Sequence, residues 1–138
     1  MLTTLSLALL LAAGPTGNAK LDQGTASVRL QLTSFETERV AVGKRGTFTS
    51  AELLFRSASG ERLDMRFLFR GTGEVPAKNI TSIVAQTKTG GLSSWTNAKG
   101  AGCRLRLNRA TEGALTGKVD CTRPESGEPF EAIFDAKR

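Results

Sequence analysis

The chain has 138 residues and a formal net charge of +6, and it contains two cysteines but no histidine and no tyrosine. The absence of histidine excludes Ser–His and Cys–His nucleophile pairs and most zinc and copper sites. The sequence contains no nucleophile elbow, P-loop or dinucleotide-binding fingerprint. We therefore expect a protein that is not an enzyme and that has no cofactor and no metal site.

Residues 1–19 have the pattern of a secretory signal peptide. An apolar run too short to span a bilayer is followed by a Gly-Pro breaker and by small residues up to Ala19, which fits cleavage before Lys20. The first residues of this segment lack the lysine or arginine that is typical of such leaders. We expect a periplasmic or secreted protein with no transmembrane anchor after cleavage, and a single domain over residues 20–138.

Alternating apolar and polar residues predict β-strands over residues 26–32 and 35–42. The two glycines and two charges of residues 43–46 predict a tight turn that is exposed to water. Lys44 and Arg45 in this turn are candidate contacts for a partner, because binding residues are often carried on exposed loops.

A β-hairpin is predicted over residues 53–69. Pairing Phe55 with Leu63 places Glu52 opposite Arg66 on the outer face, where opposite charges attract across the two strands. In this register two leucines point outward, toward a covering segment or a contact surface: Leu54 and Leu68.

A glycine-containing break at residues 71–76 separates this hairpin from the next segment. Residues 80–87 combine helical spacing with a high β-branched content, and we expect a strand there. Residues 87–102 are rich in Gly, Ser, Thr, Asn and Lys, which predicts a loop around one short segment at residues 92–96. The only tryptophan, Trp95, lies in this loop. It is a candidate partner contact, because surface tryptophans often anchor interfaces, but we favour an alternative in which it packs on the core near the cysteines.

A second hairpin is predicted over residues 103–121, with a cysteine at each end. Placing Cys103 opposite Cys121 puts both side chains on the apolar face, within reach of a disulfide. The same register sets Leu107 opposite Gly117, which leaves space for another side chain to pack. A disulfide between the two cysteines agrees with export.

This register also places like charges opposite each other, since Arg106 faces Lys118 on the outer face with Arg109 nearby. Like charges across a ladder repel, and a bound anion would remove that cost. The three residues are a candidate anion-binding site; the alternative is that their long side chains splay into water. The positive net charge favours an anionic lipid, a glycan or an envelope polymer as partner, or a protein. Nucleic acid is not expected, because tyrosine, a frequent base-stacking residue, is absent.

A last strand is predicted over residues 130–136. Many short strands separated by turns indicate an all-β fold, a single-domain antiparallel β-sandwich or small β-barrel with one disulfide within a hairpin. We expect an exported, non-enzymatic binding or envelope-associated domain that contacts an anionic ligand or surface. The alternative is a periplasmic or secreted inhibitor, or a protein-interaction module, that acts through its loops. A third hypothesis is a hydrolase that uses the carboxylates of Glu36 and Glu38.

Overall fold

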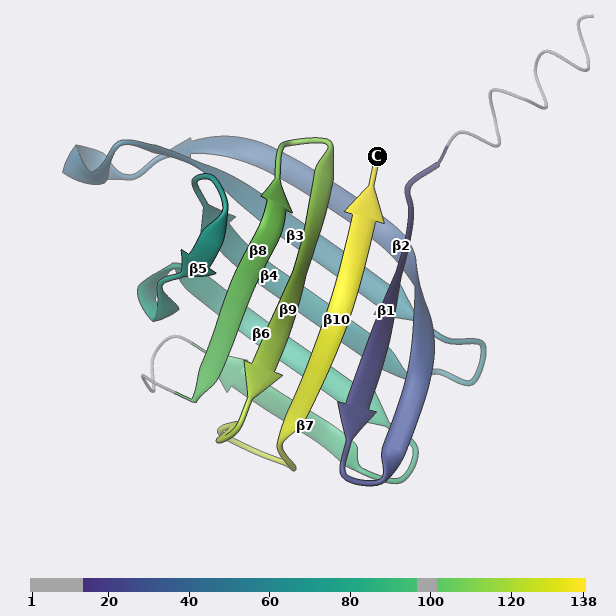
Figure 1. Ribbon diagram of the computed structural model, residues 1–138. Helices are drawn as coiled ribbons and strands as arrows, with labels where there is room; N and C mark the ends of the chain where they lie inside the picture. Colours follow the sequence, from purple (N-terminus) through teal and green to yellow (C-terminus); the bar gives the residue numbers. More distant parts are fainter. Residues whose placement is uncertain (1–13, 97–101) are drawn as a thin grey trace, which may run out of the picture.

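Ten antiparallel strands form one curled sheet in the computed structural model, which describes residues 14–96 and 102–138 (Figure 1). The all-β fold expected from the sequence is confirmed. The strand order is β5-β8-β9-β10-β1-β2-β3-β4-β6-β7, so most neighbours in the sheet are also neighbours in the chain. The strands are β1 (Thr16–Gln23), β2 (Ala26–Ala41), β3 (Thr47–Arg56), β4 (Arg62–Phe69), β5 (Gly73–Val75), β6 (Ile80–Thr87), β7 (Gly91–Thr96), β8 (Cys103–Ala110), β9 (Ala114–Cys121) and β10 (Phe130–Lys137). Two short 3-10 helices connect them, η1 (Gly43–Arg45) and η2 (Ala77–Asn79).

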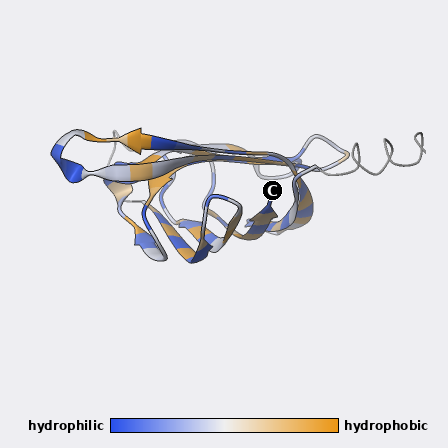
Figure 2. Cartoon of the chain, turned by 90° about the horizontal axis from the view of Figure 1, so that it is seen from above, coloured by the Kyte–Doolittle hydropathy of each residue, from blue (hydrophilic) through white to orange (hydrophobic). Residues whose placement is uncertain are grey.

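The sheet curls so that its two halves face each other across one hydrophobic cluster. Hydrophobic and hydrophilic positions alternate along the strands (Figure 2), as expected for a sheet with one buried face. β10 follows this pattern along its whole length, and its buried positions are all apolar: Phe130, Ala132, Phe134 and Ala136. Burial of alternate residues from both halves is therefore what holds the fold together.

β2 is one strand of 16 residues, where the sequence pattern suggested two. A β-bulge between Leu32 and Ser34 inserts an extra residue opposite β3. The bulge changes the phase of the alternation, so that Leu30 and Leu32 before it and Phe35 after it all face the core. The interruption in the sequence pattern marks a bulge within a strand and not a gap between two strands.

β1 begins at Thr16, within the segment predicted to be a signal peptide. Ala19 is 2% exposed and pairs with Phe134 of β10. Cleavage before Lys20 would therefore remove half of β1 from the sheet. Residues 1–13 lie outside the described residues, and the signal peptide stays a prediction.

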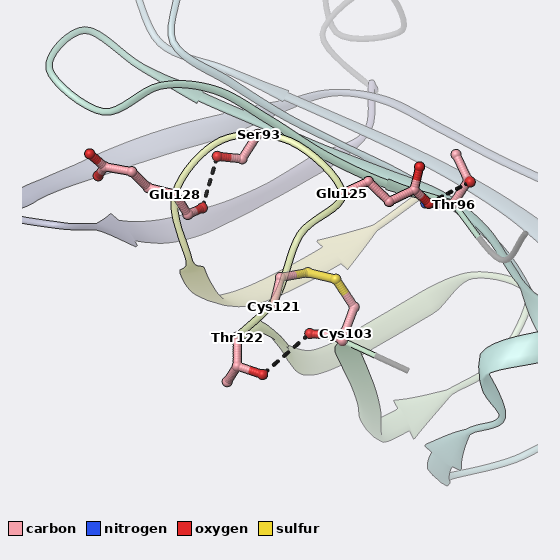
Figure 3. Close-up of a disulfide and its surroundings, with 8 residues drawn as sticks. Ser93, Thr96, Cys103, Cys121, Thr122, Glu125 and Glu128 are labelled. Carbon is pink, nitrogen blue, oxygen red and sulfur yellow. Dashed lines mark hydrogen bonds between the residues drawn. A yellow bond between two sulfur atoms is a disulfide. The ribbon is translucent and has the colours of Figure 1, made fainter. Parts of the chain in front are cut away.

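β8 and β9 form the predicted cysteine hairpin, with Cys103 opposite Cys121 and a disulfide between them (Figure 3). Both cysteines are buried. Leu107 lies opposite Gly117, as expected. The space above Gly117 is occupied by Phe134, whose Cζ would lie 3.1 Å from a β-carbon built on Gly117. The disulfide indicates a protein that folds in an oxidising, extracellular-type environment.

The hairpin of β3 and β4 also has the predicted register, with Phe55 opposite Leu63. Glu52 lies opposite Arg66, and Glu52 Oε2 is 2.6 Å from Arg66 Nε. β6 is a strand, the conformation that its β-branched residues favoured. One further strand differs from the prediction, since β5 lies in the expected break and pairs with β8. β7 covers the short segment expected within the loop and pairs with β6.

The outer edge of β7 is bonded to the turn between β9 and β10 (Figure 3). Ser94 forms an isolated bridge with Ser126, and the backbone N–H of Thr96 donates to Glu125 Oε1 at 2.7 Å. Ser93 Oγ donates to a backbone carbonyl of the same turn at 2.8 Å. These bonds join the last strand of one half of the sheet to a turn of the other half.

Candidate anion-binding site

Arg106 and Lys118 lie directly opposite each other on the outer face of the β8–β9 hairpin, as predicted. Carboxylates pair with the cations of this face. Lys118 Nζ is 3.4 Å from Glu131 Oε2, and Arg104 Nε is 3.1 Å from Glu74 Oε1. A hollow of about 280 Å³ on this face is therefore lined by charges of both signs. An anion bound there would meet carboxylates as well as cations.

Glu74 is closely coupled to the cations of this face. The hydrogen bond and the charge of Arg104 lower the pKa of Glu74 below the ordinary glutamate value, and the charge of Arg106 lowers it further. Glu74 in turn raises the pKa of Arg104. The carboxylate of Glu74 therefore already binds a cation that an external anion would have to bind.

Arg109 lies apart from the other two predicted residues. A bulge after Leu107 shifts the register of the hairpin, so that Arg109 lies opposite Thr116. It lines a separate hollow of about 340 Å³, which Asp135 also lines. The structure thus brings together two of the three residues predicted to bind an anion.

Trp95 lies on β7 and is 1% exposed. It belongs to the hydrophobic cluster that also contains Cys103 and Cys121. This burial agrees with the interpretation that Trp95 packs on the core near the cysteines. A role for Trp95 as an exposed partner contact does not fit, because so buried a side chain presents almost no surface to another molecule.

Lys44 and Arg45 are exposed in η1, at the turn between β2 and β3, which projects beyond the rest of the sheet (Figure 1). Arg45 Nη2 donates a hydrogen bond to Asn79 Oδ1 in η2. Asn79 is only 4% exposed, so this bond connects the exposed turn to a buried amide. Arg45 thereby joins two segments that lie on either side of a groove.

This groove, of about 440 Å³, lies between the end of β4, the β4–β5 turn and η2. Phe48 and Leu68 line it from outward-facing positions of β3 and β4. Phe48 is 9% exposed although it lies outside the hydrophobic cluster, and Leu68 is half-buried. Val75 and Pro76 also line the groove. Leu68, which the sequence placed outward, therefore forms part of the groove wall.

Two guanidinium groups cover the ring of Phe48. The Cζ atoms of Arg70 and Arg45 lie 4.2 Å and 5.0 Å from the ring centroid, within the range of cation–π contacts. Arg70 Nε donates to the backbone oxygen of Thr47 at 3.3 Å, and Arg70 Nη2 donates to the backbone oxygen of Arg45. A β-carbon at Gly46 would lie 2.7 Å from Arg70 Nη2, so the glycine leaves room for the guanidinium. Arg70 is therefore held in position by the backbone of the turn.

Among the described residues, no carboxylate forms an ion pair with Arg45 or Arg70, so the charge of this pair is not neutralised by them. Glu74 lines the groove, but its carboxylate is bonded to Arg104 on the outer face of β8. Lys78 also lines the groove. The groove combines cationic and apolar walls, and its chemistry suits a negatively charged group.

The sequence identified Arg45 as a candidate contact, but it did not identify Arg70 or Phe48. A signal for the missing residues was present, because the predicted register of Phe55 with Leu63, continued along the ladder, places Arg70 opposite Phe48. The approach of the β2–β3 turn and of η2 depends on the path of the chain in three dimensions. No local sequence pattern predicts this approach.

In the part of the chain that the structure describes, no group of three or more His, Cys, Asp or Glu side chains could hold a metal ion. Glu36 and Glu38 are both exposed on β2. Within residues 14–96 and 102–138, no helix has the length and apolar character needed to cross a membrane. Comparisons of the chain with models of known families, with curated proteins and with solved structures find no match.

Proposed function

We propose that this chain is an exported, non-enzymatic binding domain whose ligand carries a negative charge. The observation that carries the proposal is the pair of guanidinium groups, Arg45 and Arg70, which stack on one aromatic ring beside a groove. Guanidinium groups recognise carboxylate and phosphate oxygens through several N–H donors in a fixed plane. The net charge of +6 adds a long-range attraction for anions.

The groove is a better site than the Arg106–Lys118 face for two physical reasons. Arg70 is ordered by backbone carbonyls and by Phe48 before a ligand arrives, so less side-chain entropy is lost on binding. On the β8–β9 face, by contrast, Glu131 competes with an external anion for Lys118. We therefore assign the ligand to the groove.

The binding proposal is tested by titrating the ¹⁵N-labelled protein with inorganic phosphate at low ionic strength. We expect the largest amide shifts around Arg45, Phe48 and Arg70, and weaker binding in Arg45→Gln and Arg70→Gln. Arg29→Gln is the matched control, because Arg29 is an exposed strand arginine outside the groove and its loss changes the net charge equally. Equal phosphate binding by all three variants would remove the groove from consideration.

The proposal also includes a location in the periplasm or outside the cell. The Cys103–Cys121 disulfide supports an oxidising compartment, and the apolar segment before β1 supports export. Protein recovered from its native compartment without reductant is expected to resist thiol labelling at both sulfurs. N-terminal sequencing of the same material gives the cleavage point. Labelling of both cysteines would contradict the proposed location.

A second candidate function is a protein-interaction or inhibitor module that acts through the β2–β3 turn. The observation in its favour is that this turn projects beyond the sheet and exposes Lys44 (Figure 1). Inhibition of a purified protease or lysozyme, lost on Lys44→Ala but kept on Arg70→Gln, would support this function over ligand binding in the groove.

A further inference from the structure

The groove beside Phe48 has apolar walls as well as cations, and this combination restricts the chemistry of its ligand. We propose that it binds one molecule of a single-chain anionic amphiphile, with the head group on Arg45 and Arg70 and the alkyl chain along Leu68 and Pro76. The inference rests on the proposed function, and it specifies which class of anion the site selects.

The head-group end is defined by the donors of the two arginines. A guanidinium has five N–H donors in one plane. In the described residues, Arg70 directs donors at the backbone oxygens of Thr47 and Arg45, and Arg45 directs one at Asn79. The remaining donors of both groups can bind the oxygens of a carboxylate, sulfate or phosphate.

The chain end is defined by apolar side chains that line the groove. Phe48 and Leu68 occupy outward positions of adjacent strands, and Phe48 lies outside the hydrophobic cluster. Val75 and Pro76 line the same groove. An alkyl chain laid there would cover the half-buried Leu68 and would remove apolar surface from water.

The size of the groove favours one chain over a bulky lipid. Its volume of about 440 Å³ lies toward the lower end of the range for small-molecule sites, roughly 300–1,000 Å³. The large hydrophobic residues that are strongly exposed in the described chain are Leu92 on β7 and Ile133 on β10, neither of which lines the groove. The turn at residues 43–46 carries no large apolar residue that would insert into a bilayer. A single dissolved amphiphile therefore fits the groove better than a membrane surface does.

The experiment is an isothermal titration of the full chain with butyl, hexyl and octyl phosphate, each below its micelle concentration, with inorganic phosphate as the reference anion. Complete burial of one methylene group corresponds to about fourfold in affinity. Because the groove is open on one side, we expect about twofold for each methylene, so octyl phosphate should bind on the order of tenfold tighter than butyl phosphate.

Two variants separate the two ends of the site. Leu68→Gln is expected to flatten the dependence on chain length while inorganic phosphate binding is retained. Arg70→Gln is expected to weaken binding of every member of the series. Leu92→Gln, which changes an exposed leucine elsewhere on the sheet, is the control for Leu68→Gln, and thermal melts confirm that each variant folds. Leu68→Ala replaces Leu68→Gln should the latter not fold.

The outcomes distinguish this inference from the function on which it rests. Equal affinity for butyl and octyl phosphate, with binding still lost in Arg70→Gln, would overturn the amphiphile and leave an anion site. Octyl phosphate binding unchanged in both variants would place the amphiphile elsewhere and overturn the inference. Adsorption to phosphatidylglycerol vesicles without binding of octyl phosphate would also overturn it. Failure of inorganic phosphate and all three alkyl phosphates to bind would overturn both proposals.

Discussion

The disulfide offers the sharpest test of how this fold is stabilised. Replacing both cysteines, in the double variant Cys103→Ala with Cys121→Ala, removes the covalent link but keeps two small apolar side chains on the buried face. The sheet ladder between β8 and β9 continues beyond the cysteines, so the hairpin has other bonds that hold it in the native state. We therefore expect the variant to fold, with a lower free energy of unfolding.

The magnitude follows from the length of the loop that the disulfide closes. The two cysteines are 18 residues apart in sequence. On the chain-entropy model a loop of this size restricts the unfolded chain enough to stabilise the protein by about 3 kcal/mol. Urea unfolding of small proteins has a slope of about 1–3 kcal/mol per molar, so the midpoint should fall by about 1–3 M.

The assay is equilibrium urea unfolding followed by tryptophan fluorescence, on the oxidised protein, the protein reduced with dithiothreitol and the double variant. The reduced protein and the double variant should have similar midpoints, and dithiothreitol should not change the midpoint of the variant. A double variant whose unfolding free energy lies within about 0.5 kcal/mol of the oxidised protein would refute the reasoning.

Three further predictions concern single positions. Gly117→Val should lower the free energy of unfolding by about 1–3 kcal/mol, since its β-carbon would clash with the backbone oxygen of Arg106 and crowd the ring of Phe134, and a thermal melt equal to wild type would contradict this. Acrylamide should quench the fluorescence of Trp95 weakly because the side chain is 1% exposed, and strong quenching would contradict the core position. The carboxyl of Glu74 should titrate below the ordinary glutamate pKa in a ¹³C NMR titration, and Arg104→Gln should raise that pKa. Because the pKa of Glu74 is lowered in the folded protein, the stability that this ion pair contributes is present above the ordinary glutamate pKa. That stability is lost as the pH falls through the lowered value.

Strands with an uninterrupted alternation could be predicted from the sequence down to individual pairs. In the β8–β9 hairpin, the two cysteines and the apolar residues between them agree on a single register, because a slip by one residue would turn every apolar side chain outward. The same argument applies to Phe55 and Leu63 in the β3–β4 hairpin. In both cases the predicted pairs are those observed.

Strands in which the alternation is interrupted or too short to recognise were predicted less well from the sequence. The bulge after Leu32 shifted the inward positions of β2 by one residue and made one strand look like two. The first half of β1 has the small residues of a cleavage site, although Ala19 and Leu21 both face the core. β5 has three residues, too few to show a period.

The binding groove was the least predictable part, because its residues come from segments that have no common sequence pattern. Arg45 and Arg70 are separated by a complete hairpin, and Asn79 reaches Arg45 only because η2 packs beside the end of β4. The β3–β4 register brings Arg70 beside Phe48, but the approach of η2 depends on the path of the chain after β4. Charge and alternation alone identified the β8–β9 face, where the neighbours are set by one local register.

The pairing of β1 with β10 has a consequence for engineering this protein. Thr16 lies opposite Lys137, so β1 and β10, the first and last strands along the described chain, pair side by side, and the start of β1 lies beside the end of β10 (Figure 1). A short glycine-rich linker could join these ends, and new termini could be opened in the exposed turn at residues 57–61. Such a circular permutant would keep every strand pair but change the order of the strands along the chain. Its stability and folding rate would show how far the fold depends on that order.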